Sequence, residues 1–90
     1  MHLVVRTDDF KRALTRLPSR IRELCDRQLA ILESDWRDPR LHTKKLRLRD
    51  EIYSFRITSS YRAQFYFSVE NRIIVFDVDH RKDAYRKRRR

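Results

Sequence analysis

Glycine is absent from the 90 residues of the chain, and cysteine occurs only once, at position 25. Without glycine, a turn that needs a positive φ has to use Asn, Asp or Ser, so we expect no tight primed hairpin turns. The single Cys25 excludes an internal disulfide and is typical of proteins in a reducing compartment. No Cys and His residues have the spacing of zinc ligands, and we therefore expect neither a metal site nor a cofactor.

Long apolar runs are also missing from the sequence. No segment approaches the roughly 20 apolar residues that span a bilayer, and the N-terminus lacks the apolar stretch of a signal peptide. These absences predict a soluble, cytoplasmic protein with no membrane partner.

Acidic residues are too few to balance the basic ones, since 23 Lys and Arg face 13 Asp and Glu and the net charge is +10. The excess lies in two segments. Residues 40–62 carry seven basic and two acidic residues, and residues 80–90 carry seven and one. If the two segments meet in the fold, they form one electropositive surface, as expected for a protein that binds a phosphate backbone.

The first third of the chain predicts a strand and two helices. Residues 2–6 form a short apolar segment, and Thr7 is a suitable N-cap for a helix whose apolar residues follow a period of 3.6. Pro18 ends that helix and begins a second one, which has a broad apolar stripe that includes Cys25. Two helices so close in sequence form an antiparallel hairpin.

From residue 52 the period of the apolar residues changes to two. Residues 52–57 and 61–67 alternate between apolar and polar, and residues 73–78 are apolar enough for a central strand. The order β-α-α-β-β-β predicts one α+β domain over residues 1–90. In it, a small antiparallel sheet is backed by the N-terminal helical hairpin, and a basic segment, 80–90, follows.

Two arginines are the first candidates for a functional site. If residues 58–60 form a loop, Arg56 lies opposite Arg62 on the sheet face away from the helices, together with Ser54, Gln64 and Tyr66. Like charges directly opposite each other destabilise a sheet, so a bridging phosphate would explain the pair. The alternative is a solvated face on which the arginine stems cover apolar surface.

Three residues beyond the last predicted strand complete the candidate catalytic set of Arg56, Arg62, His80, Arg81 and Tyr85. Histidine has an ordinary pKa near neutrality, arginine clamps a phosphate in a bidentate manner, and tyrosine stacks on a base. A purely structural interpretation is open for each of the three. The predicted RNA-binding residues are Lys44, Lys45, Arg47, Arg49, Ser54, Gln64, Lys82 and Arg86.

Four motifs, in this order, resemble the RelE/ParE superfamily of toxins of type II toxin–antitoxin systems. They are Asp38-Pro39, Lys44-Lys45-Leu46, Ile52-Tyr53-Ser54-Phe55-Arg56-Ile57 with Tyr61-Arg62, and Val75-Phe76-Asp77-Val78-Asp79-His80-Arg81-Lys82-Asp83-Ala84-Tyr85-Arg86. The resemblance covers nearly the whole chain and is strongest over residues 38–86. The family fold is the sheet and helical hairpin predicted above.

The resemblance implies a metal-independent endoribonuclease that cuts mRNA on the ribosome, through attack of a 2′-hydroxyl on its own phosphate. It implies that Arg56 acts near the 2′-hydroxyl and that Arg62 stabilises the phosphate. Arg81 would act on the leaving group, and Tyr85 would stack on a base.

The sequence departs from the family pattern at Ser54, where a second lysine is often found, while other members use a histidine near position 80. The identity of the general base therefore stays open.

The resemblance also implies a partner antitoxin, acidic or amphipathic, contacts with mRNA and rRNA, and a monomeric free toxin. Two other functions stay open. One is a ParE-like inhibitor of DNA gyrase, and the other is a non-catalytic basic protein that binds RNA or the ribosome.

Overall fold

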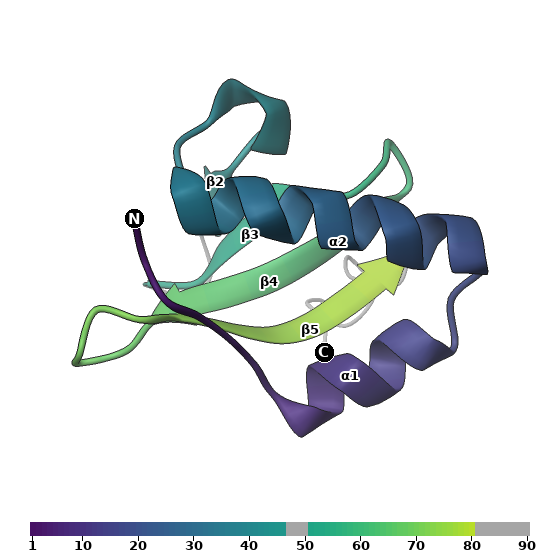
Figure 1. Ribbon diagram of the computed structural model, residues 1–90, viewed down its shortest axis with the longest axis horizontal. Coiled ribbons are helices and arrows are strands. Elements are labelled where there is room, and N and C mark those ends of the chain that lie inside the picture. Colours follow the sequence, from purple (N-terminus) through teal and green to yellow (C-terminus); the bar gives the residue numbers. More distant parts are fainter. Residues whose placement is uncertain (47–50, 81–90) are drawn as a thin grey trace.

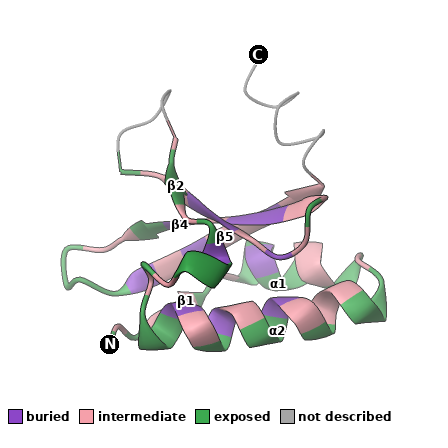
Figure 2. Ribbon diagram, turned by 90° about the horizontal axis from the view of Figure 1, so that it is seen from above, coloured by how far each residue is buried: buried purple, intermediate pink, exposed green. Residues whose placement is uncertain are grey.

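The structure is a computed structural model and describes residues 1–46 and 51–80 (Figure 1). The elements follow in the order β1 (Val4–Arg6), α1 (Asp8–Thr15), α2 (Ser19–Ser34), the 3-10 helix η1 (Pro39–Leu41), β2 (Lys44–Lys45), β3 (Tyr53–Arg56), β4 (Tyr61–Phe67) and β5 (Ile73–His80). The predicted α+β fold is confirmed, with both helices on one side of the sheet (Figure 2).

The helical hairpin forms where the sequence predicts it, because each boundary has a local cause. Thr7 caps α1, since its Oγ1 accepts a hydrogen bond from the Phe10 backbone amide at 3.1 Å. Pro18 precedes α2, where a missing N–H costs nothing. The guanidinium of Arg22 donates to the Leu17 carbonyl oxygen at 2.8 Å, which fixes the turn between the helices.

The sheet has five strands in the order β1-β5-β4-β3-β2. Its pairs are antiparallel except that β1 runs parallel to β5, an arrangement that the sequence-based prediction of an antiparallel sheet did not contain. The two-residue strand β2 was also not predicted as a strand. It pairs with β3 and extends the sheet beyond the alternating segments.

The core lies between the helices and one face of the sheet. Cys25 is fully buried there, as the apolar stripe of its helix predicted, and so are Phe10 of α1 and Phe55 and Phe65 of the sheet. The ring of Trp36 contacts the core edge-on, with its centroid 5.1 Å from that of Phe67. These contacts attach the segment after α2 to the sheet.

Positive φ angles occur at His42, Glu51 and Asn71 in the described part of the chain. Asn71 agrees with the expectation that Asn, Asp or Ser would occupy such positions, whereas His42 and Glu51 do not. Within residues 1–46 and 51–80, neither helix combines the length and apolarity that a membrane span requires.

Candidate nucleic-acid interface

The strand register defines a polar face on the side of the sheet opposite the helices. Lys44 pairs with Ser54, Ser54 with Gln64, and Gln64 with Asp77, so their side chains form one row across four strands. A second row consists of Arg56, Arg62 and Asp79. We call these two rows, together with Tyr66, Ile74 and Phe76, the polar face.

Arg56 lies directly opposite Arg62, as the alternation of the two strands predicted. Their backbones meet at the end of the β3–β4 hairpin, where Ile57 donates to the Tyr61 carbonyl oxygen at 2.9 Å. The Nε of Arg56 is buried and has no hydrogen-bond partner among residues 1–46 and 51–80. A buried donor without a partner costs about 1–3 kcal/mol, and a phosphate oxygen would remove that cost.

The polar face is partly shielded from solvent although the helices lie on the other side. Ser54 is 2% exposed and Arg62 is also buried. Shielding lowers the local dielectric constant, so a guanidinium there attracts an anion more strongly than one in open water. This face therefore offers stronger electrostatic stabilisation than the exposed arginines elsewhere on the chain.

Two carboxylates on the polar face were missed by the sequence analysis. Asp79 is the strand partner of Arg62, and Asp77 is the partner of Gln64. They reach this face because the β4–β5 register shifts between Gln64 and Phe65, so that Phe76 is an extra residue in β5. Asp79 gives Arg62 an opposite charge across the ladder, which stabilises the guanidinium next to the like charge of Arg56.

His80 is the predicted catalytic residue that the structure does not bring to Arg56 and Arg62. It pairs with Tyr61, whose ring packs against the core on the helix side. The His80 and Tyr61 rings meet edge-on at 5.2 Å between centroids. The physical reason is the bulge, since simple alternation from Ile73 would have put His80 on the polar face.

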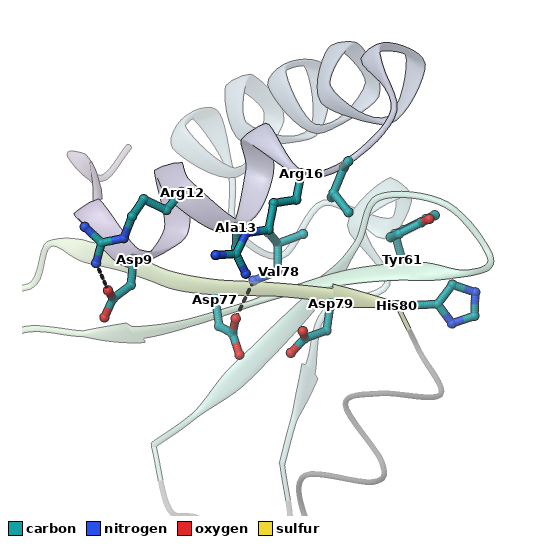
Figure 3. Close-up of a pocket in the computed structure, with 10 residues that line it drawn as sticks. Asp9, Arg12, Ala13, Arg16, Tyr61, Asp77, Val78, Asp79 and His80 are labelled. Carbon is teal, nitrogen blue, oxygen red and sulfur yellow. Dashed lines mark hydrogen bonds and ion pairs between the residues drawn. The ribbon is translucent and has the colours of Figure 1, made fainter.

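Figure 3 shows the consequence at the end of β5, where Asp77 and Asp79 point away from α1 and His80 lies towards Tyr61. A hollow of about 480 Å³ lies here, with Arg12 and Arg16 on its α1 side. Asp9 also lines this hollow, and its carboxylate forms an ion pair with the guanidinium of Arg12. The hollow therefore has no marked preference for an anion, and a phosphate is better accommodated between Arg56 and Arg62.

The two adjacent lysines of β2 point to opposite faces of the sheet. Lys44 pairs with Ser54 on the polar face, whereas Lys45 pairs with Tyr53 on the helix side. Both side chains are exposed. Of the predicted RNA-binding residues, Lys44, Ser54 and Gln64 thus lie together, and Lys45 lies apart from them.

A partly buried contact from α2 positions the end of β3. The Gln28 side-chain amide donates to the Arg56 carbonyl oxygen at 2.7 Å and to the Arg40 carbonyl oxygen at 3.0 Å. Gln28 therefore ties η1 and the backbone of Arg56 to the same helix. Nothing in the sequence pattern indicated this role of Gln28.

The segment before β2 is held by a charged cap. Asp38 accepts hydrogen bonds from the Arg40 backbone amide at 2.9 Å and from the Arg40 guanidinium at 2.8 Å. These bonds lower the pKa of Asp38 to about 2. The cap accounts for the Asp38-Pro39 motif as a structural element that leads the chain into β2.

Six predicted site residues lie outside the described part of the chain. They are Arg47, Arg49, Arg81, Lys82, Tyr85 and Arg86. Within the described residues, no group of three or more His, Cys, Asp or Glu side chains is placed to hold a metal ion.

Comparison with known proteins identifies similar structures but no similar sequence family. No protein-family model and no curated protein matches the chain. The chain resembles a solved structure of the toxin–antitoxin complex RelBE2 from Mycobacterium tuberculosis, with a TM-score of 0.62 and 27% sequence identity. That match covers 89% of this chain and 98% of the other.

Two further structures share the fold at lower identity. A RelB–RelE antitoxin–toxin complex from Methanococcus jannaschii matches with a TM-score of 0.76 and 21% identity, over 92% of this chain and 96% of the other. A YoeB/ParE toxin from Agrobacterium tumefaciens matches with a TM-score of 0.70 and 18% identity, over 87% and 96%.

Proposed function

We propose that the chain, which shares the fold of the RelE toxins, is a member of the RelE/ParE superfamily and the toxin of a type II toxin–antitoxin system that cleaves mRNA on the ribosome. Neighbours solved as toxin–antitoxin complexes support a dedicated antitoxin as its partner. We expect that antitoxin to be acidic or amphipathic, because the chain carries a net charge of +10.

The observation that carries the nuclease proposal is the Arg56–Arg62 pair, with the buried and unpartnered Nε of Arg56 among the described residues. In the proposed reaction, the 2′-oxygen forms a bond to the adjacent phosphorus and the bond to the 5′-oxygen breaks. The products are a 2′,3′-cyclic phosphate and a 5′-hydroxyl. Negative charge accumulates on the phosphate in the transition state, and two fixed guanidinium groups stabilise it.

The proton transfers need other groups. Arginine stays protonated at neutral pH, so neither Arg56 nor Arg62 is an ordinary general base. The family resemblance assigns leaving-group stabilisation to Arg81 and base stacking to Tyr85, and both assignments remain part of the proposal. Because His80 faces Tyr61, we expect His80→Gln to slow cleavage far less than Arg62→Ala does.

A cleavage assay with purified translating ribosomes tests the proposal. The wild-type chain should cut mRNA, and Arg56→Ala and Arg62→Ala should each slow cleavage about 100-fold or more, the usual cost of losing one transition-state donor. Arg72→Ala is the matched control, since it removes the same charge from an exposed arginine near the β4–β5 turn, whose guanidinium forms an ion pair with Glu70. Intact mRNA in the presence of folded wild-type protein would refute the nuclease proposal.

A second candidate function is inhibition of DNA gyrase, and the similarity to a structure named YoeB/ParE toxin favours it. A gyrase inhibitor needs a binding surface but no catalytic arginine pair. A supercoiling assay separates the two proposals, because inhibition of supercoiling without RNA cleavage would favour the second.

A third candidate is a non-catalytic protein that binds RNA or the ribosome. Its support is Ser54, which is small and neutral. The positive charge in this row of side chains comes instead from Lys44, the strand partner of Ser54 in β2. Tight RNA binding with a steep salt dependence and no cleavage would favour this candidate.

A further inference from the structure

An aromatic pair lies on the polar face and has no part in the proposed reaction. The rings of Tyr66 in β4 and Phe76 in β5 lie 5.7 Å apart between centroids and are tilted by 50°. Tyr66 is 37% exposed. The other exposed large hydrophobic side chains of the described residues are Met1 and Leu3 near the N-terminus and Val69 after the end of β4.

Phe76 lies next to Tyr66 at the bulge in β5. The register passes from Gln64 opposite Asp77 to Phe65 opposite Val75, which leaves Phe76 without a strand partner. Val75 is buried in the core and Phe76, the next residue, is only partly buried, so the ring of Phe76 lies on the other side of the sheet, beside Tyr66. Bulges of this kind redirect side chains and are common beside functional sites.

The Tyr66–Phe76 pair lies on the same face of the sheet as the cationic residues, further along β4. Tyr66 follows Arg62 by four residues on the same face of β4, a separation of roughly 13 Å at the usual rise of a strand. The row of Lys44, Ser54, Gln64 and Asp77 lies between them. A polynucleotide chain with a phosphate at Arg56 and Arg62 can therefore follow the face and reach the aromatic rings.

Packing alone does not explain the position of these rings. A cross-strand aromatic pair stabilises a sheet, but the stabilisation is greatest when the rings are removed from water. The core-facing pairs achieve this, since Phe55 and Phe65 are fully buried. A partly exposed flat ring beside fixed cations is instead the arrangement by which proteins bind single-stranded RNA, whose bases stack on aromatic side chains.

We propose that Tyr66 and Phe76 form a stacking platform for a base of single-stranded RNA, at a nucleotide beyond the linkage held by Arg56 and Arg62. This inference rests on the proposed RNA-directed function and adds a second contact to it. Every base has a flat face, so the platform binds with little sequence preference. Its role is to hold the strand in register with the arginine pair.

A short single-stranded oligonucleotide with 2′-O-methyl groups tests the platform, because it lacks the attacking hydroxyl and cannot be cleaved. It carries the fluorescent base 2-aminopurine at one position at a time, since stacking on an aromatic ring quenches this base. Binding is measured at low salt for the wild-type chain and for Tyr66→Phe, Tyr66→Leu and Phe76→Leu. Val69→Ala is the control for loss of an exposed apolar side chain, and resistance of Cys25 to a thiol reagent shows that each variant is folded.

We expect the wild-type chain and Tyr66→Phe to bind the oligonucleotide equally and to quench 2-aminopurine at one position. Tyr66→Leu should bind about tenfold more weakly and lose the quenching, while Val69→Ala changes neither. Wild-type affinity and quenching in folded Tyr66→Leu and Phe76→Leu would overturn the platform and leave the proposed nuclease standing. Failure of the wild-type chain to bind the oligonucleotide at all would also overturn the platform, whereas the nuclease proposal is decided separately by the cleavage assay with translating ribosomes.

Discussion

Gln28 connects the helical layer to the polar face through two hydrogen bonds from one side-chain amide. The Gln28 Nε2 donates to the carbonyl oxygens of Arg40 and Arg56, which lie 12 and 28 residues further along the chain. A carbonyl oxygen that loses its donor in a partly buried place is costly. The position of Arg56 therefore depends on a residue that never approaches the proposed phosphate.

Gln28→Met keeps the length of this side chain and removes both hydrogen bonds. We expect it to lower the free energy of unfolding by about 1–3 kcal/mol, because two carbonyl oxygens lose a partner. Urea denaturation followed by circular dichroism measures the change. Arg27→Met, at the exposed neighbouring position, should stay within about 0.5 kcal/mol of the wild type. Equal stability of Gln28→Met and Arg27→Met would show that the contact is unimportant.

Cys25 should be inert in the folded protein. Burial, helped by the negative charge of Asp26, raises the pKa of its thiol to about 12, so almost no thiolate forms at neutral pH. We expect alkylation by iodoacetamide at pH 8 to be slow and to accelerate at the urea concentrations that unfold the chain. Rapid labelling without urea would contradict the buried position of Cys25.

Asp38 gives the structure a sensitivity to acid. Its pKa in the folded chain is about 2, below the ordinary value of 3.8, so its cap stabilises the fold above about pH 4. That contribution is lost as the pH falls from about 4 towards 2. Asp38→Asn should therefore be less stable than the wild type at pH 7, and the difference should shrink in this acid range. A difference in urea midpoint that does not change with pH would contradict this explanation.

The individual strands show where sequence-based prediction succeeded and where it failed. Alternation in β3 and β4 correctly placed Arg56 opposite Arg62, because a regular antiparallel pair fixes the face of every residue. In β5 the same rule fails after Val75, since one extra residue reverses the faces of Asp77, Asp79 and His80. The segment 73–78 begins with four consecutive apolar residues, which give no indication of a bulge because apolar side chains occur on both faces.

The short strand β2 provides a matched pair of lysines on opposite faces. Lys44 lies on the polar face opposite Ser54, and Lys45 lies opposite Tyr53 on the helix side. Both variants, Lys44→Ala and Lys45→Ala, remove one exposed positive charge from adjacent positions. The two variants therefore change the net charge of the chain equally, and they differ only in the face of the sheet from which the charge is removed.

We expect Lys44→Ala to weaken binding of single-stranded RNA several-fold more than Lys45→Ala, because only Lys44 lies beside the arginine pair. Titration with a fluorescent oligonucleotide at two salt concentrations measures both losses. The loss for Lys44→Ala should also be smaller at high salt, since a phosphate contact is screened there. Equal losses for both variants would mean that net charge alone governs binding.

In the whole molecule, the two faces of the sheet differ in chemical character. The helix side holds the apolar core, and the polar face holds cations on β2, β3 and β4 and carboxylates on β5. The sequence predicted this division and the fold class, because composition and period are properties of whole segments. It did not predict that Asp77 and Asp79 lie on the polar face, because this depends on one bulge. It also did not predict the hydrogen bond from Gln28 to the Arg56 carbonyl oxygen, which is a long-range contact.

Part of the excess positive charge of the chain gathers on one face of the sheet. Of the basic segment 40–62, Lys44, Arg56 and Arg62 lie on the polar face, next to Asp77 and Asp79. The carboxylates repel a phosphate, so an RNA strand is directed towards the β2–β4 side of this face. The arrangement of these charges on the polar face, rather than the net charge, is what distinguishes the proposed nuclease site from a generally basic surface.

In the proposed reaction, Arg56 and Arg62 act together on one phosphate. The most direct test is a double-mutant cycle, in which the rate of mRNA cleavage on purified translating ribosomes is measured for Arg56→Ala, Arg62→Ala and the double variant. Two groups that stabilise the same transition-state charge are strongly non-additive. We predict that the double variant is only slightly slower than the slower single variant, whereas a loss equal to the product of the two single losses would contradict a shared phosphate.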